Sequence, residues 1–206
     1  MRDQLAERIA GVVLAAGAST RMGKNKLLLD LAGESVVRRA ARVALDAGLR
    51  PVILVLGHEA ARVRAALSGL DCVPVVNPAF AAGMDGSIRA GVAAVPPDAV
   101  AAVVTLADMP LVDATMIATL VACYRETRAP LVVSDYAGVR APPVLYDRRL
   151  FPELLTLDGG GGKQVIARHR ADAVAVSWPR RALADLDEPA DHERVLRALR
   201  SEGGGR

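Results

Sequence analysis

Aromatic residues are scarce in this chain: only 3% of its 206 residues are phenylalanine, tryptophan or tyrosine. Proteins that bind single-stranded nucleic acid usually combine stacking aromatic side chains with a strongly basic groove. The formal net charge is a mild +3, and the arginines gather in patches that solvated helix faces explain. The composition therefore argues against nucleic-acid binding, and we expect no nucleic-acid partner.

Cysteine is nearly absent as well, and long hydrophobic runs do not occur. Cys72 and Cys123 have neither the spacing of metal ligands nor a disulfide framework, so we expect two buried thiols in a reducing compartment. The longest apolar stretch, residues 92–106, is interrupted by Pro96-Pro97-Asp98 and cannot cross a bilayer. Acidic Asp3 stands before any apolar run, unlike a secretory signal. We expect a cytoplasmic protein without membrane contact.

Histidine is also rare, and no catalytic triad is recognisable. His58, His169 and His192 are scattered along the chain. His58 follows Gly57 at the end of an expected strand, where a surface or capping role is favoured over catalysis. A reaction whose nucleophile is a substrate phosphate needs no protein base, because a second phosphate pKa of about 6 leaves that group largely ionised at neutral pH.

Small aliphatic residues, in contrast, are abundant, and hydrophobic residues make up 52% of the chain. Short β-branched runs alternate with longer helical patterns, which predicts an α/β fold: a mostly parallel Rossmann-like sheet with helices on both faces. Pro74 weakens one run and marks it as an edge strand. We expect strands at residues 9–14, 51–56, 72–76, 101–106, 131–136, 143–146 and 173–176, and helices at 35–47, 59–67, 86–94, 113–128 (N-capped by Asp113), 151–157, 163–169 and from 189.

The chain is long enough to bury the core of one domain. No linker or internal repeat divides it, so we expect a single domain over residues 1–200. The glycine-rich end, residues 201–206, is expected to be a disordered tail.

The segment from Val12 to Lys26 carries the strongest signal. An apolar strand runs into a loop with two glycines, two hydroxyls and the cations Arg21, Lys24 and Lys26. Glycine allows backbone N–H groups to approach phosphate oxygens, and the cations supply the opposing charge. The spacing matches neither a Walker loop nor a dinucleotide fingerprint. A polar surface loop is the alternative, but the strand ahead of it favours a phosphate site in the crevice of an α/β sheet.

Asp108 follows the expected strand 101–106 and should lie at the same edge of the sheet. Mg²⁺ is commonly shared between one or two carboxylates and substrate phosphates, which makes Asp108 a candidate ligand; a simple turn is the alternative. Asp187 is the favoured second carboxylate and Asp185 its rival. Helix capping ahead of Pro189 would also explain that pair.

Four segments in the same order resemble the MobA-like nucleotidyltransferases, and among them most closely the molybdenum cofactor cytidylyltransferases. They are Leu14-Ala15-Ala16-Gly17 through Lys26; Asn77-Pro78 with Gly83 to Gly91; Leu106-Ala107-Asp108-Met109-Pro110-Leu111; and Asp185-Leu186-Asp187-Glu188-Pro189. The resemblance extends over nearly the whole chain.

The resemblance implies a GT-A-like nucleotidyltransferase fold. It also implies a Mg²⁺-dependent reaction that transfers CMP from CTP to the phosphate of molybdenum-bearing molybdopterin and releases pyrophosphate. Residues 9–128 would form the nucleotide-binding half and residues 129–200 the acceptor half. A molybdenum hydroxylase would be the recipient of the product. Alternatives are transfer from GTP, another small phosphorylated acceptor, or a cofactor-binding chaperone without turnover.

The resemblance also implies roles for individual residues. Arg21 and Lys26 would hold the β- and γ-phosphates, and Asp108 with Asp187 would hold the metal. The nucleotide pocket would be formed by Leu14, Ala15, Ala16, Gly17, Gly83 and Ser87. Related guanylyltransferases have glycine at the position of Ala16, whose methyl group narrows the pocket floor and so favours CTP over GTP.

Two departures from the family pattern affect the acceptor side. The run from Asp158 through Gly162 places glycine where the family has an acid, although Lys163 keeps the cation. Asp85-Gly86 replaces a more usual pair of serines. Lys163 is a candidate ligand of an acceptor phosphate; the alternative is that the glycine run is only a flexible loop.

Overall fold

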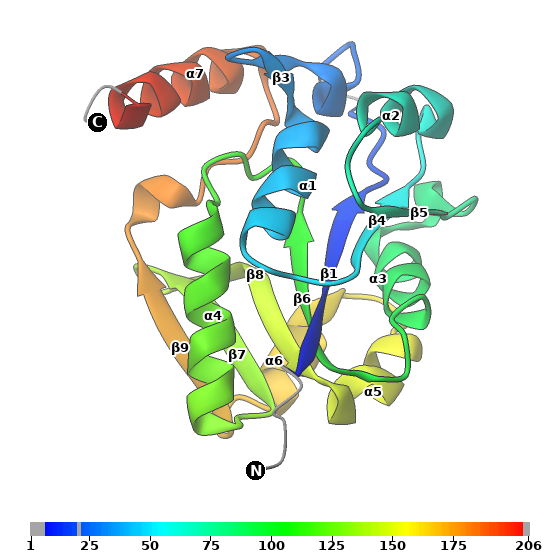
Figure 1. The fold of residues 1–206 in the computed structure, drawn as a ribbon, viewed down its shortest axis with the longest axis vertical. Coiled ribbons are helices and arrows are strands. Elements are labelled where there is room, and N and C mark those ends of the chain that lie inside the picture. The colour runs from blue at the N-terminus through cyan, green and yellow to red at the C-terminus, as the bar shows by residue number, and fades with distance from the viewer. Residues whose placement is uncertain (1–6, 20–21, 204–206) are drawn as a thin grey trace.

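The computed structural model describes residues 7–19 and 22–203. One sheet of seven strands runs through this part of the chain, in the order β5-β4-β1-β6-β8-β7-β9 (Figure 1). The strands are β1 (Arg8–Ala15), β4 (Val52–Leu56), β5 (Val73–Val76), β6 (Ala99–Leu106), β7 (Leu131–Tyr136), β8 (Val139–Asp147) and β9 (Ala173–Trp178). Neighbours are parallel except for β8, which is antiparallel to both β6 and β7. The expected mostly parallel sheet is therefore confirmed.

Helices cover both faces of the sheet, as expected. They are α1 (Val36–Asp46), α2 (Ala60–Ala66), α3 (Met84–Ala93), α4 (Ala114–Thr127), α5 (Phe151–Leu155), α6 (Gly162–Arg168) and α7 (Pro189–Gly203). Alternate residues of a strand point to opposite faces. In β1, Val13 packs into a core with α1, α2 and α4, whereas Val12 and Leu14 pack into a second core with α3, α5 and α6.

The local signals in the sequence predict these elements well. Asp113 caps α4, because its Oδ1 accepts a hydrogen bond from the backbone N–H of Met116 at 2.8 Å. β5 is an edge strand, as Pro74 indicates. β8 is longer than expected because the tight turn at Ala137 and Gly138, both with positive φ, pairs it with β7 from Val139 onward.

Two expectations are wrong. α7 continues to Gly203, so residues 201–203 are helical and do not belong to the disordered tail expected over residues 201–206; helix propagation adds one hydrogen bond per residue. Residues 204–206 lie outside the described part. Cys72 and Cys123 are free but half-buried rather than buried. Cys72 precedes the edge strand, and Cys123 lies beside the buried stripe of α4, not on it.

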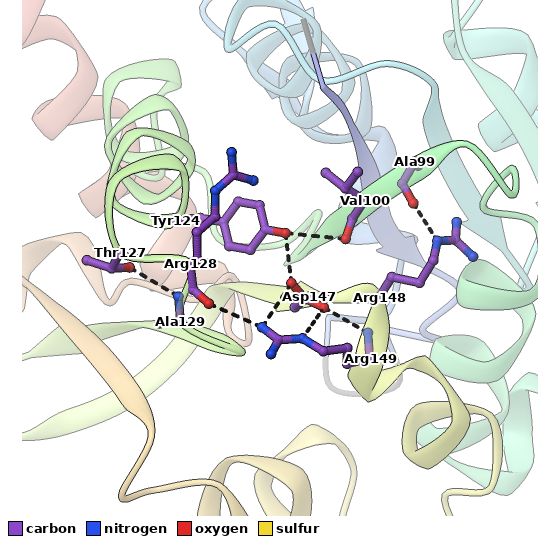
Figure 2. Close-up of polar contacts among 9 residues, drawn as sticks. All are labelled: Ala99, Val100, Tyr124, Thr127, Arg128, Ala129, Asp147, Arg148 and Arg149. Carbon is purple, nitrogen blue, oxygen red and sulfur yellow. Dashed lines mark hydrogen bonds and ion pairs between the residues drawn. The ribbon is translucent and has the colours of Figure 1, made fainter.

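Asp147 organises the end of the sheet where β6 begins (Figure 2). Its carboxylate accepts hydrogen bonds from Tyr124 Oη at 2.8 Å and from Arg149 Nε at 2.9 Å. Arg149 also donates to the backbone carbonyl of Arg128 at 3.1 Å. Burial alone would raise the pKa of Asp147, but the bonds from Arg149 and Tyr124 outweigh it and lower that pKa. This network joins α4, β6 and β8.

A helix long and apolar enough to cross a membrane does not occur among the described residues.

Candidate active site

A cavity of about 250 Å³ opens at the carboxyl ends of β1 and β6. Parallel strands that end together create such a crevice in α/β sheets. The residues that line it come from the glycine turn, from the segment leading into α3 and from the end of β6: Leu14, Ala15, Ala16, Gly17, Lys26, Leu27, Phe80, Gly83, Met84, Ser87, Leu106 and Asp108. Every nucleotide-pocket residue expected from the sequence is in this set except Arg21, which lies outside the described residues.

The turn after β1 is held in place by its own polar groups. Ser19 has a positive φ of 52°, and its Oγ accepts a hydrogen bond from the backbone N–H of Lys26 at 3.1 Å. Asn25 then starts a short 3₁₀ helix over Lys26–Leu28, with its Oδ1 accepting from the N–H of Leu27 at 3.1 Å. These bonds return the chain to the sheet edge, which brings the Lys26 side chain to the cavity.

The Lys26 ammonium lies between two carboxylates. Its Nζ is 2.6 Å from Oδ2 of Asp108 and 3.0 Å from Oδ1 of Asp187. Burial alone would lower the pKa of Lys26, but the charges and hydrogen bonds of Asp108 and then Asp187 outweigh it and raise that pKa. Lys26 is therefore cationic throughout the neutral range.

The segment 185–187 is anchored to the loop after β6. Leu186 is fully buried and donates its backbone N–H to the carbonyl oxygen of Asp108 at 3.1 Å. Asp191 accepts from the backbone N–H groups of Asp187 and Glu188 at 2.9 and 2.8 Å, which closes the first turn of α7. Asp191 therefore contributes to the cap of α7.

Asp185 and Asp187 differ in their surroundings. Asp187 contacts Lys26, whereas no direct contact joins Asp185 to that ammonium among the described interactions. Partial loss of hydration, and then the like charges of Asp108 and Asp187, raise the pKa of Asp185, although its side chain keeps access to solvent. The geometry favours Asp187 as the partner of Asp108.

The far wall of the cavity is formed by the entry to α3. Gly83 adopts φ 121° and ψ −179°, a conformation that strongly favours glycine. Ser87 is buried, and its Oγ accepts a hydrogen bond from Nδ2 of Asn77 at 3.0 Å. Asn77 is also buried, so the pair fixes the start of α3 against the end of β5. Ser87 thus links α3 to the residue after β5, and its hydroxyl proton can donate a hydrogen bond to a ligand.

Sequence reasoning did not single out Leu27, Phe80, Met84 or Leu106 as cavity residues, although the stretch from Gly83 to Ser87 resembles the family segment that lines the base pocket. Phe80 belongs to a short 3₁₀ helix over Phe80–Ala82, and Met84 is the first residue of α3. Both are hydrophobic residues at a cavity mouth, and Met84 is 51% exposed. The closeness of Met84 to Gly83 was the signal that could have identified it.

The remaining expected residues lie elsewhere. Lys163 is exposed at the start of α6 and does not line the cavity. Lys24 lines a second, wider cavity of about 620 Å³ beside the glycine turn, together with His58 and Arg62. The His58 side chain is partly exposed, and its ring contacts the Phe80 ring in a tilted arrangement. This placement fits the surface role expected for His58.

The donor set at the cavity fits a hard divalent cation. Asp108 and Asp187 each present a carboxylate oxygen to a shared cation, in this structure the Lys26 ammonium. Within the described residues no group of three or more His, Cys, Asp or Glu is gathered for a metal. Two carboxylates suffice for Mg²⁺ when substrate phosphates and water complete its shell.

Comparison with known proteins places this site in a family. The MobA-like NTP transferase domain matches residues 11–174. The purine catabolism protein PucB of Bacillus subtilis is 31% identical over 207 residues, covering 93% of this chain and 97% of PucB. The nicotine blue oxidoreductase of Paenarthrobacter nicotinovorans is 32% identical, covering 79% of this chain and 82% of that protein. A probable molybdenum cofactor guanylyltransferase of Opitutus terrae is 33% identical, covering 62% of this chain and 61% of its own length.

Solved structures agree with this assignment. Rv0371c of Mycobacterium tuberculosis H37Rv superposes with a TM-score of 0.83 at 32% identity, covering 93% of this chain and 99% of Rv0371c. Another structure of Rv0371c, at a TM-score of 0.73, is a complex with manganese. The chain therefore belongs to the MobA-like NTP transferase family and is a nucleotidyltransferase related to those that act on the molybdenum cofactor.

Proposed function

We propose that this enzyme transfers CMP from CTP to the terminal phosphate of molybdenum-bearing molybdopterin, in a Mg²⁺-dependent reaction that releases pyrophosphate. The observation that supports it most is the convergence of Lys26, Asp108 and Asp187 beside a cavity lined by the glycine turn and by Gly83 and Ser87. In this arrangement the cavity offers space for a nucleotide base, and one ammonium and two carboxylates lie together at one end of it.

In the proposed reaction, an oxygen of the acceptor phosphate attacks the α-phosphorus of CTP. The new bond joins that oxygen to the α-phosphorus, the bond from the α-phosphorus to the bridging oxygen breaks, and pyrophosphate leaves. The described residues provide no general base at the site, and none is needed for a nucleophile that is already ionised. The contribution of the protein is positioning and neutralisation of charge.

In this proposal the Lys26 ammonium changes its binding partners when the nucleotide binds. Without nucleotide its ammonium neutralises Asp108 and Asp187. With nucleotide bound, we propose that it turns to the β- and γ-phosphates, together with Arg21. Asp108 and Asp187 would then hold Mg²⁺, which would offset negative charge on the nucleotide phosphates. The manganese complex of Rv0371c supports a divalent cation in this family.

Ala16 supports CTP as the nucleotide. It is 6% exposed and lines the cavity, and its carbonyl oxygen accepts a hydrogen bond from the N–H of His58 at 3.2 Å. The backbone at Ala16 is therefore fixed, and we propose that its methyl group limits the size of the base that the cavity accepts. Under this proposal a pyrimidine is preferred to a purine.

GTP is the second candidate, because a probable molybdenum cofactor guanylyltransferase is among the relatives. The test is a panel of CTP, GTP, ATP and UTP, each incubated with the purified enzyme, Mg²⁺ and molybdenum-loaded molybdopterin. Pyrophosphate release is measured and the product is identified by mass. The proposal requires a CMP adduct; a GMP adduct would overturn the nucleotide assignment, and turnover only with other phosphorylated acceptors would overturn the acceptor.

Asp108→Asn tests the metal role in the same assay. The amide keeps the size of the side chain but removes the charge, so turnover should fall at least about a hundredfold because transition-state charge is no longer neutralised. Circular dichroism should show a folded protein. Turnover within a few-fold of wild type would contradict the role of Asp108.

A further inference from the structure

α3 contacts two parts of the molecule with two different faces. Gly83, Met84 and Ser87 face the nucleotide cavity. Asp85 and Arg89, one helical turn apart, instead reach the segment between α5 and α6. Arg89 donates a hydrogen bond from its guanidinium to the carbonyl oxygen of Leu157, and Asp85 accepts one at Oδ2 from the backbone N–H of Gly159. One helix therefore borders the cavity and also holds a loop that is distant in sequence.

That loop is the glycine run Gly159–Gly162. Its first three residues have φ values of 87°, 79° and 63°, in the left-handed region. A Cβ atom added at Gly161 would lie 3.7 Å from Oδ1 of Asp85 and 3.9 Å from Sδ of Met84. The loop thus crosses the first turn of α3 within contact distance of Met84, a residue of the cavity rim.

The loop also fixes where α6 begins. A Cβ atom at Gly162 would lie 2.6 Å from Oη of Tyr146, so this glycine allows α6 to start directly against β8. Lys163 follows at once and is exposed, without an ion pair to any described residue. The placement of this ammonium relative to the cavity depends on the loop that precedes it.

A run of glycines has high conformational entropy and does not hold one shape without external contacts. The contact from Asp85 is a hydrogen bond to an anionic acceptor, which is among the stronger kinds. Asp85 does not cap its own helix: α3 has Gly83 at its N-cap and no side-chain capping bond. Its carboxylate is directed to a residue 74 positions away.

We propose that Asp85 is a positioning residue for the acceptor substrate. By fixing Gly159 against α3, it holds the glycine loop within contact distance of Met84 at the cavity rim, and so orients the loop and Lys163 for the phosphate of an anionic acceptor. This inference rests on the proposed function, since it assumes an acceptor that carries phosphate.

The test compares Asp85→Ala with Asp85→Asn in steady-state kinetics. Alanine removes the hydrogen-bond acceptor, so KM for the acceptor should rise about tenfold, the size of effect expected from one charge-assisted hydrogen bond. KM for the nucleotide and kcat should stay within about twofold. Asparagine keeps an oxygen that accepts from Gly159 and should recover most of the acceptor affinity. Asp172→Ala, an exposed acid just after α6, is the control for loss of one negative charge and should match wild type.

Hydrogen exchange provides a readout that needs no substrate. Peptides covering residues 157–163 should exchange faster in Asp85→Ala than in wild type, while peptides of β1 and β6 should not change. An unchanged acceptor KM would overturn the proposal, as would an equal rise in nucleotide KM, which indicates a general defect of α3. A fall in acceptor KM would also overturn it, because it would mean that the Asp85 carboxylate competes with the acceptor phosphate.

Failure of the proposed function gives a different result. In that case wild type itself forms no CMP adduct in the nucleotide panel. The same comparison is then made with the nucleotide and acceptor that wild type does use, and the hydrogen-exchange result applies without alteration.

Discussion

Leu186 donates its backbone N–H to the carbonyl oxygen of Asp108, at 3.1 Å, and this bond joins the segment between β9 and α7 to the loop after β6. Because the Leu186 side chain is also fully buried, the residue after it is held at the cavity. Asp187 can therefore share the Lys26 ammonium with Asp108. The metal site that we propose depends on this backbone contact as much as on the carboxylates themselves.

Lys26→Met should change metal binding and turnover in opposite directions. Without the ammonium, the carboxylates of Asp108 and Asp187 repel one another and attract a free cation. The nucleotide-free variant should therefore bind Mn²⁺ about tenfold more tightly than wild type. The effect is no larger because solvent screens the Coulomb interaction at this partly exposed site. Turnover should fall at least about a hundredfold because a phosphate-neutralising charge is lost. Manganese binding is measured by electron paramagnetic resonance. Weaker Mn²⁺ binding in the variant would show that Lys26 does not occupy the cation position.

Asp187→Asn and Asp185→Asn should separate the two candidate ligands. Only Asp187 contacts Lys26, so its substitution should reduce turnover at least about thirtyfold, whereas Asp185→Asn should stay within about threefold. Pyrophosphate release at saturating substrate is the measurement. The reverse order of effects would assign the metal to Asp185.

Asp185 should also affect stability in a pH-dependent way. Its pKa is raised in the folded state, so the folded protein binds this proton more tightly than the unfolded chain and loses stability as pH rises through that pKa. Asp185→Asn should therefore raise the melting temperature at pH 7, and the gain should vanish near pH 3, where the carboxyl is protonated in both states. Thermal melts at the two pH values measure it; an equal gain at both would exclude this electrostatic origin.

Ala16→Gly should relax nucleotide selection. Removing the methyl group enlarges the cavity floor, so kcat/KM for GTP should rise relative to CTP by about tenfold, the range that one methyl group contributes to substrate discrimination. Competition between the two nucleotides in one reaction gives the ratio directly. An unchanged ratio would mean that Ala16 does not contact the base.

Asp147 should govern acid stability without affecting catalysis. Its pKa is lowered in the folded state, so its contribution is present above the unfolded value near 3.8 and is lost as pH falls through the folded pKa. Tyr124→Phe removes one of its hydrogen bonds and should cost about 1–2 kcal/mol at pH 7. Urea unfolding at pH 7 and pH 3 should show a smaller difference at the lower pH. Because this network lies where β6 begins, turnover of the folded variant should match wild type (Figure 2).

The order of strands and helices could be predicted from the chain because it depends on local chemistry. The apolar run before Gly17, the periodicity of α1 and α4, and Asp113 as a cap are all set by residues close in sequence. The same holds for the first half of the site. Lys26 and Asp108 each follow a buried strand, and parallel strands bring their carboxyl ends to one edge.

Other relationships were decided only when distant segments packed. The contact of Lys26 with Asp187 and the bond from Gly159 to Asp85 join residues that no local pattern connects. These contacts depend on where β8, β9 and α7 are placed relative to the first half. Sequence periodicity determines which face of a strand or helix is buried, but the partner of that face is determined by the packing of the whole sheet.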